Sequence, residues 1–240
     1  MIENRRMLVI LPHPDDESFP MGGTLAKYAA EGVEITLICE TLGEMGIPEM
    51  EPAQAAIIRE KELKAAASVL GIGKVQLMRY QDGSLSNLDS ERVISQLMNA
   101  MRRIHPKVVI TFGPDGISGH PDHVAISRLV TIAFDRAIIR SSLPLTAKLF
   151  SVTPSDATLQ GCGIVPSQEV AGGPVAGIDI TDYRLPKVRA MQSHASQNPP
   201  FKGDPEKEIE NLACHEYFTL ARPSGNITDS TDLFAPLKEK

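Results

Sequence analysis

Residues 7–17 read Met-Leu-Val-Ile-Leu-Pro-His-Pro-Asp-Asp-Glu, an apolar run that changes abruptly into histidine, proline and acidic residues. Five apolar residues without polar alternation are typical of a parallel strand that is covered by helices on both faces. A helical pattern over 21–30 follows, and Gly32 stands just after it, where a left-handed C-terminal cap favours glycine. The stretch therefore predicts the first strand–helix unit of an α/β fold, with the charged residues in the connecting turn.

Short apolar runs continue to alternate with longer helical patterns through the first 140 residues. This alternation predicts βαβ units on a mostly parallel sheet. The expected strands are Met7–Leu11, Val33–Cys39, Val75–Met78 and Val108–Phe112, and the expected helices are Met21–Ala30, Ala55–Leu70, Ser90–Ile104 and Val124–Ile139. Beyond residue 140 we expect strands over Leu149–Val152 and Val175–Ile180, a helix over Asp182–His194 and a late strand that opens at His215.

The composition favours one domain over residues 1–240, because 240 residues with 42% hydrophobic content suit a single buried core. A net charge of −6 lacks the basic excess that a phosphate backbone requires, so we expect no nucleic-acid partner. The N-terminal apolar run is too short for a signal peptide or a membrane span, which predicts a cytoplasmic protein without membrane contact. Three cysteines without a Cys-x-x-Cys pair predict neither disulfides nor a thiolate zinc site.

Two segments carry the chemistry: Pro12–Glu17 after the first expected strand, and Gly-His-Pro-Asp-His at 119–123 after the fourth. Loops at the carboxyl ends of parallel strands line one binding crevice, so these side chains can converge. Imidazoles and carboxylates without thiolates suit catalytic zinc, and iron(II) or manganese could use the same set. Without a cation, so many ionisable groups would repel one another. The alternative is two solvated turns, with Asp15 or Asp16 as the cap of the first helix.

The chain resembles the LmbE-like or PIG-L-type N-acetylglucosamine deacetylases. The matching segments are Pro-His-Pro-Asp-Asp-Glu at 12–17, Thr-Leu-Gly-Glu-Met-Gly at 41–46, Arg-Glu-Lys-Glu-Leu at 59–63, His-Pro-Asp-His-x-Ala at 120–125 and His-Ala-Ser-Gln at 194–197. The resemblance implies a Rossmann-like three-layer sandwich with a mostly parallel central sheet. It also implies zinc-dependent removal of an acetyl group from an N-acetylated sugar or a related small amide. Residues 141–173 match nothing in the family, which leaves the amide open.

The resemblance assigns roles to five residues of the two motifs. His13, Asp16 and His123 would hold Zn²⁺, Asp15 would be the general base and His120 would stabilise the transition state. Zinc lowers the pKa of a bound water to about 7, so a neighbouring carboxylate can accept its proton. A protonated His120 could then stabilise the tetrahedral oxyanion. The resemblance also favours a homo-oligomer, the common state of such enzymes.

Three further residues in or near the motifs are candidates for supporting roles. Asp122 could orient an imidazole from behind, whereas Glu17 could do this for His13 or cap the following helix. Arg59 is expected from the resemblance to contact the substrate, and its alternative is a surface ion pair with Glu62.

Two further residues are candidates for substrate contact. Asp82 follows the third expected strand at the same sheet edge, although Asp-Gly is also a common turn. His194 stands near a helix end, where an imidazolium also satisfies the helix dipole.

Two other functions compete with the deacetylase. One is a metal-stabilised binding protein of the same fold without catalysis, but Asp15 and His120 would be superfluous for three-ligand metal binding. The other is a nucleotide-binding protein, suggested by Gly22 and Gly23 near the first turn. The G-x-G-x-x-G spacing is absent, and the acidic residues of the turn would repel a pyrophosphate.

Overall fold

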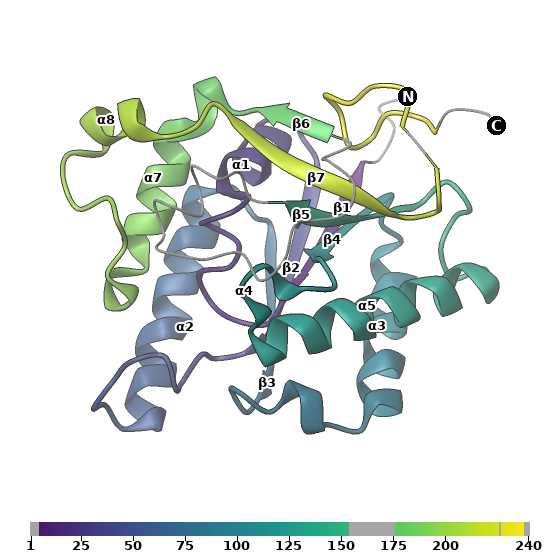
Figure 1. The fold of residues 1–240 in the computed structure, drawn as a ribbon, viewed down its shortest axis with the longest axis horizontal. Coiled ribbons are helices and arrows are strands. Elements are labelled where there is room, and N and C mark those ends of the chain that lie inside the picture. The colour runs from purple at the N-terminus through teal and green to yellow at the C-terminus, as the bar shows by residue number, and fades with distance from the viewer. Residues whose placement is uncertain (1–4, 154–175, 226, 238–240) are drawn as a thin grey trace.

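A computed structural model describes residues 5–153, 176–225 and 227–237 of the chain. The strands of this described part form one sheet in the order β3-β2-β1-β4-β5-β7-β6 (Figure 1). Their bounds are β1 Arg6–Leu11, β2 Glu34–Thr41, β3 Lys74–Tyr80, β4 Val108–Phe112, β5 Lys148–Thr153, β6 Ala176–Asp179 and β7 His215–Arg222. Val175, where we expected the sixth strand to open, lies outside the described residues, as does Cys162.

The sheet is mostly parallel, as the sequence predicts. β1 pairs in parallel with β2 and β4, and the pairs β2–β3 and β4–β5 are also parallel, whereas β7 runs antiparallel to β5 and β6. The strand order reverses direction between β1 and β4. In such sheets the crevice outside the carboxyl ends of these two strands is the usual ligand site. The first histidine motif follows β1 directly, and the second follows β4 by way of the short helix α4, Gly116–Gly119.

Helices cover both faces of the sheet and complete the three layers. Figure 1 shows α1, α2 and α7 on one face and α3 and α5 on the other, and the helices of each group pack against one another. β1, in the middle, is the centre of the core: Met7–Leu11 are all 0% exposed. The helix bounds are α1 Gly22–Ala30, α2 Pro52–Val69, α3 Ser90–Ile104, α4 Gly116–Gly119, α5 Pro121–Ile139, α7 Arg184–Ser193 and α8 Pro205–Glu208.

Helix α5 begins at Pro121, three residues before the expected start at Val124. The His120 side chain is its N-cap, accepting the Asp122 backbone N–H, and Pro121 takes the first helical position. Proline suits that position because the helix needs no N–H donor there. Imidazole is an uncommon cap, which explains the missed boundary. As a result, Asp122 and His123 lie on the first turn of a helix and not in a free loop.

The C-terminal part of the chain is tied to α1 by the buried carboxylate of Glu216. Glu216 of β7 accepts hydrogen bonds from the backbone N–H groups of Gly23 and Thr24, and it pairs with Lys187 of α7 at 2.6 Å. Both charged side chains are less than 5% exposed. The residue preceding α1 supplies no side-chain cap. Glu216 therefore satisfies the helix N-terminus from the far end of the sequence.

One acidic residue lies in the core of the sheet. Glu40 of β2 is 0% exposed, and within the described residues neither of its carboxylate oxygens has a hydrogen-bond partner. Burial raises the pKa of Glu40 to about 8. The sequence gives no sign of this burial, because Glu40 directly follows the apolar run that ends at Cys39.

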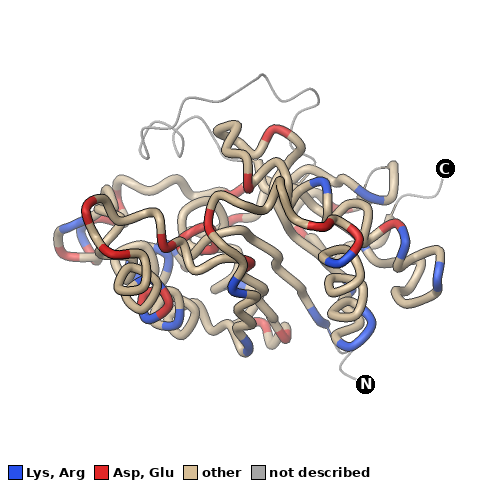
Figure 2. Tube along the Cα trace, turned by 90° about the horizontal axis from the view of Figure 1, so that it is seen from below, with Lys and Arg blue, Asp and Glu red and all other residues tan. Residues whose placement is uncertain are grey.

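Acidic and basic residues are interspersed along the described chain (Figure 2). Within that part, no helix has both the length and the apolar character needed to span a bilayer.

Candidate metal and catalytic site

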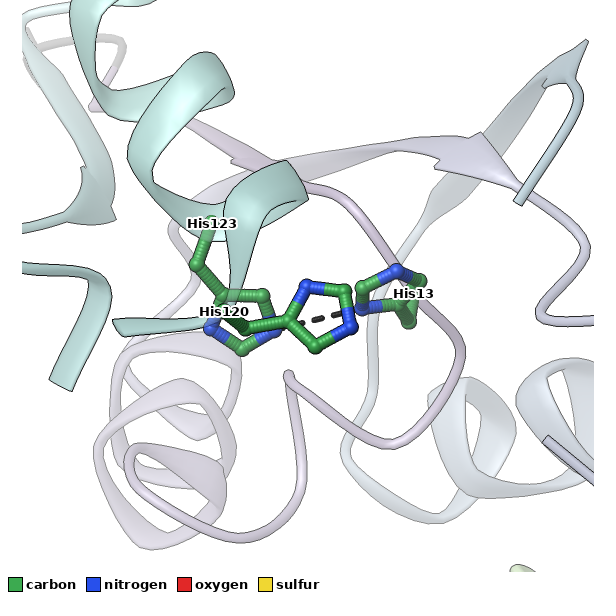
Figure 3. Close-up of side chains that lie close together, drawn as sticks. All are labelled: His13, His120 and His123. Carbon is green, nitrogen blue, oxygen red and sulfur yellow. Dashed lines mark hydrogen bonds between the residues drawn. The ribbon is translucent and has the colours of Figure 1, made fainter. Parts of the chain in front are cut away.

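The three predicted metal ligands converge at the sheet edge. His13 Nδ1 lies 3.2 Å from His123 Nε2 and 3.6 Å from Asp16 Oδ2, and His123 Nε2 lies 3.5 Å from Asp16 Oδ1. Ligands about 2.0–2.1 Å from a tetrahedral zinc stand roughly 3.3 Å apart. Two imidazole nitrogens and a carboxylate at these separations fit such an ion. Figure 3 shows how His13 and His123 reach this point from different elements.

Local contacts fix the three side chains. The His13 backbone N–H donates to Asp16 Oδ2 at 2.9 Å, which folds the turn after β1 so that both side chains face the same point. His123 Nδ1 lies 3.2 Å from the Gly116 carbonyl oxygen, and the ring stacks on Phe112 at the end of β4. A hydrogen bond from Nδ1–H to a carbonyl leaves Nε2 free to bind a metal.

The other nitrogen of His13 is backed by two carboxylates. His13 Nε2 lies 3.0 Å from Asp82 Oδ1 and 3.3 Å from Asp122 Oδ2. Asp122 also accepts the backbone N–H groups of Gly83 and Leu85, and Asp82 accepts that of Met45. Burial would lower the pKa of His13, but hydrogen bonds with Asp122 and Asp82 and the charge of Asp16 outweigh it and raise the pKa to about 10. Such carboxylate–histidine contacts orient metal ligands.

Asp122 therefore lies where an imidazole-orienting residue would be. Asp82, for which we predicted substrate contact, makes the same kind of contact from the turn after β3. Its side chain is 9% exposed, so its carboxylate faces His13 more than the solvent. Substrate contact by Asp82 stays a prediction.

Asp15 lies outside the converging ligand atoms and is held by Arg59. Arg59 Nη2 donates to Asp15 Oδ2 at 2.8 Å and to the Pro14 carbonyl oxygen at 2.5 Å, while Nη1 donates to the Gly43 carbonyl oxygen. Burial and the neighbouring Asp16 raise the pKa of Asp15. Arg59 is 3% exposed and so lies beneath the motif. The alternative that we gave for Arg59, a surface ion pair with Glu62, is wrong, because the Arg59 guanidinium is buried and bonds Asp15 and two backbone carbonyl groups. Glu62 accepts hydrogen bonds from Ser196.

His120 is on the exposed side of the site. Its ring centroid lies 4.8 Å from that of His13 and 5.0 Å from that of His123 (Figure 3). Its Nδ1 accepts the Asp122 N–H, so the neutral ring carries its proton on Nε2. Burial and the neighbouring His13 and His123 lower the pKa of His120. The protonated state that we expected is thus disfavoured, and an Nε2–H donor remains.

Glu17 and His194 form a buried pair behind the motif. His194 Nε2 donates to Glu17 Oε1 at 2.7 Å, and both side chains are 0% exposed. Burial would raise the pKa of Glu17, but the charge of His194 and hydrogen bonds lower it. We expected Glu17 to orient His13 or to cap the next helix, and we expected His194 to contact substrate. The sequence around Glu17 and the sequence around His194 did not predict that these two residues pair, because 177 residues separate them.

The fold and the site define a class: a Rossmann-like α/β protein with a candidate metal site at the switch point of its sheet. Within this class the chain belongs to the PIG-L family. The family model for GlcNAc-PI de-N-acetylases matches residues 8–134, a segment that contains both histidine motifs.

Two bacterial relatives extend the match along the chain. A probable N-acetyl-α-D-glucosaminyl L-malate deacetylase 2 of Bacillus anthracis is 32% identical over 82% of this chain and 83% of its own length. A 1D-myo-inositol 2-acetamido-2-deoxy-α-D-glucopyranoside deacetylase of Rhodococcus erythropolis is 29% identical over 97% of this chain and 98% of its own.

Solved structures share the fold. The N,N'-diacetylchitobiose deacetylase of Pyrococcus horikoshii superimposes with a TM-score of 0.64 at 27% identity, covering 90% of this chain and 83% of that one. The 4-carboxy-2-hydroxymuconate hydratase GalB of Pseudomonas putida superimposes with a TM-score of 0.71 at 20% identity, covering 91% and 97%. Because the same fold is also found in a hydratase, the activity must be argued from the site.

Proposed function

We propose that this chain is a zinc-dependent deacetylase that removes the acetyl group from an N-acetylated sugar. The observation that carries the proposal is the convergence of His13, Asp16 and His123, with Asp15 beside them and outside the ligand set. A binding protein would need only the first three residues. Membership of a deacetylase family and the printed activities of the relatives support the same reaction.

Each side chain of the site has its own role in the proposed reaction. A zinc ion held by the three ligands would acidify a water molecule and polarise the amide carbonyl. Asp15 accepts the proton of the attacking water and later delivers a proton to the amine leaving group. His120 donates its Nε2–H to the oxyanion that develops on the former carbonyl oxygen, and Asp122 and Asp82 orient the His13 ring.

The substrate class follows from the relatives, which act on N-acetylglucosamine linked to malate or inositol and on diacetylchitobiose. We predicted substrate contact for Arg59, Asp82 and His194, and all three side chains are at least nine-tenths buried. Substrate contact stays a prediction for Arg59 and Asp82, whereas His194 makes its polar contact with Glu17. We expect acetate release from at least one of these three sugar types. Zinc binding without hydrolysis of any of these sugars would favour the non-catalytic binding protein.

The location of the protein in the cytoplasm stays a prediction.

The proposed metal ligands predict the zinc content of the protein and of its variants. The protein should hold about one zinc per chain, and His13→Ala or His123→Ala should each abolish stoichiometric binding, because two ligands hold zinc far more weakly than three. Ring nitrogens of His13, His120 and His123 also lie within 4.8 Å of one another. His120→Ala should nevertheless keep its zinc, since in the ligand set proposed here Asp16 and not His120 is the third ligand. Elemental analysis after gel filtration measures the content, and His215→Ala on β7 is the matched control. Full occupancy in both ligand variants, or loss in His120→Ala, would contradict this ligand set.

A further inference from the structure

We propose that His194 is a positioning residue that holds Asp15 in place through Glu17. The inference rests on the proposed function, in which Asp15 is the general base. It goes beyond that function because it gives a task to a buried ring 177 residues away from Glu17 in the sequence.

Hydrogen bonds connect His194 to Asp15 through Glu17. His194 Nε2 donates to Glu17 Oε1, and the other oxygen, Oε2, accepts the backbone N–H of Asp15 at 3.1 Å. Ser18 Oγ also donates to Oε1. Within the described residues His194 Nδ1 has no partner, so the polar contact of the ring is with Glu17. A fully buried carboxylate needs such partners to stay in one orientation.

The backbone of Asp15 has an unfavourable conformation that its neighbours must hold. Its φ of 100° lies in the left-handed region that residues other than glycine rarely adopt. Such a conformation costs about 1–3 kcal/mol and persists only where the surroundings enforce it. Glu17 bonds the amide of Asp15 on one side, and Arg59 bonds its carboxylate on the other. Without the Glu17 contact, Asp15 could relax away from the position that proton transfer requires.

The segment that carries His194 is itself held by hydrogen bonds to other elements. Ser196 donates its backbone N–H and its hydroxyl to Glu62 of α2, and Gln197 donates to the Gly46 carbonyl oxygen. The segment 194–197 thus contacts the loops after β1 and β2 as well as α2. The His194 ring is therefore placed by fixed neighbours and is 0% exposed, which suits a support better than a substrate contact.

A pair of substitutions at residue 194 tests the proposal. His194→Gln places an amide N–H donor near the position of Nε2, whereas the shorter His194→Asn cannot reach Glu17. We expect His194→Asn to lower kcat by about 10- to 100-fold, the range for residues that orient catalytic groups, with KM within about 2-fold and zinc content unchanged. His194→Gln should recover most of the lost kcat. Ser193→Ala, next to His194 in the chain, removes an exposed hydrogen bond to the Arg189 carbonyl oxygen without touching Glu17; it is the control and should retain wild-type kcat.

A second readout does not depend on turnover. Hydrogen exchange of the Asp15 amide, followed by NMR in the zinc-loaded protein, should accelerate at least about 10-fold in His194→Asn and not in His194→Gln. If His194→Asn fails to fold, Glu17→Gln tests the same link and should show the same loss in kcat alone.

Three outcomes would overturn the proposal. The first is a wild-type kcat together with a wild-type exchange rate of the Asp15 amide in His194→Asn or Glu17→Gln. The second is an equal loss of kcat in the Asn and Gln variants of His194, and the third is a defect confined to KM, which would indicate substrate contact. If the wild-type protein released no acetate from any N-acetylated sugar, the proposed function would fail, and the Asp15 amide exchange would still decide whether His194 holds the loop.

Discussion

Asp15 combines a left-handed backbone with a carboxylate that Arg59 holds 2.8 Å away. Asparagine tolerates this backbone region better than most residues and keeps the size of the side chain. Asp15→Asn therefore removes the charge and the proton acceptor, while its amide oxygen can still accept the hydrogen bond from Arg59. We expect kcat to fall at least roughly 10²-fold while the zinc content stays at the wild-type level. Steady-state kinetics on the best sugar and elemental analysis measure the two quantities. Asp89→Asn, which keeps a good cap on α3, is the control, and near-wild-type kcat in Asp15→Asn would remove Asp15 from its role.

Glu40 predicts a pH-dependent stability that is independent of catalysis. Its pKa is raised from 4.5 to about 8 in the folded protein, so the folded state keeps a proton that the unfolded chain releases. The stability contributed by that proton is complete below pH 4.5 and is lost as the pH rises to about 8. Glu40→Gln, which cannot ionise, should therefore melt at least about 3 °C above wild type at pH 8, with a much smaller difference at pH 5.

Differential scanning calorimetry at the two pH values measures this effect. Glu34→Gln is the matched control, because Glu34 opens the same strand and is exposed. An increase in melting temperature that is equal at both pH values would show that Glu40 does not take up a proton on folding.

Among the elements, the loop after β2 is shaped around the Arg59 guanidinium. A Cβ atom at Gly46 would lie 2.3 Å from Arg59 Nη1, and one at Gly43, where φ is +62°, would lie 2.1 Å from it. Gly46→Ala should therefore displace Arg59 from Asp15 and Pro14 and lower kcat/KM about 10-fold or more, while the fold is retained. Gly73→Ala is the control, since its Cβ meets only the Ile35 carbonyl oxygen at 3.7 Å. Wild-type kcat/KM in Gly46→Ala would show that the fit around Arg59 is not needed.

The same loop shows which parts of the site the sequence could predict. Residues that are adjacent in sequence and lie at strand ends, such as His13 and Asp16, could be predicted to meet His123, because parallel strands end at one edge. The partners of Arg59 could not be predicted, because they are backbone carbonyl groups and a carboxylate brought together only by packing. The pairing of Glu17 with His194 was missed for the same reason.

For the whole molecule, the apolar runs predicted a mostly parallel α/β sheet and the order of its first five strands along the chain. The position of β7 between β5 and β6 could not be predicted, because an antiparallel pairing leaves no distinct pattern in a strand of eight residues. The buried charges Lys187 and Glu216 were missed too, since charged residues are rarely buried and each looks solvated in the sequence.

The assembly of the whole molecule stays a prediction. A closed homo-oligomer is the common state of enzymes of this size, so we expect a mass in solution above the 26.0 kDa of one chain. Multi-angle light scattering behind gel filtration measures it. A mass of one chain throughout the micromolar range would contradict the prediction.

The ties from Glu216 to α1 and from His194 to Glu17 have a consequence for the newly made chain. During synthesis the N-terminal residues leave the ribosome first. His13, Asp16 and His123 can therefore be free to bind a metal while residues 194 and 216 are still to be translated. We expect a nascent chain to be able to capture zinc at this stage, before the supports of Asp15 and of α1 exist. Metal uptake would then precede competence for hydrolysis, and an incomplete chain released early would carry zinc without cleaving amides in the cell.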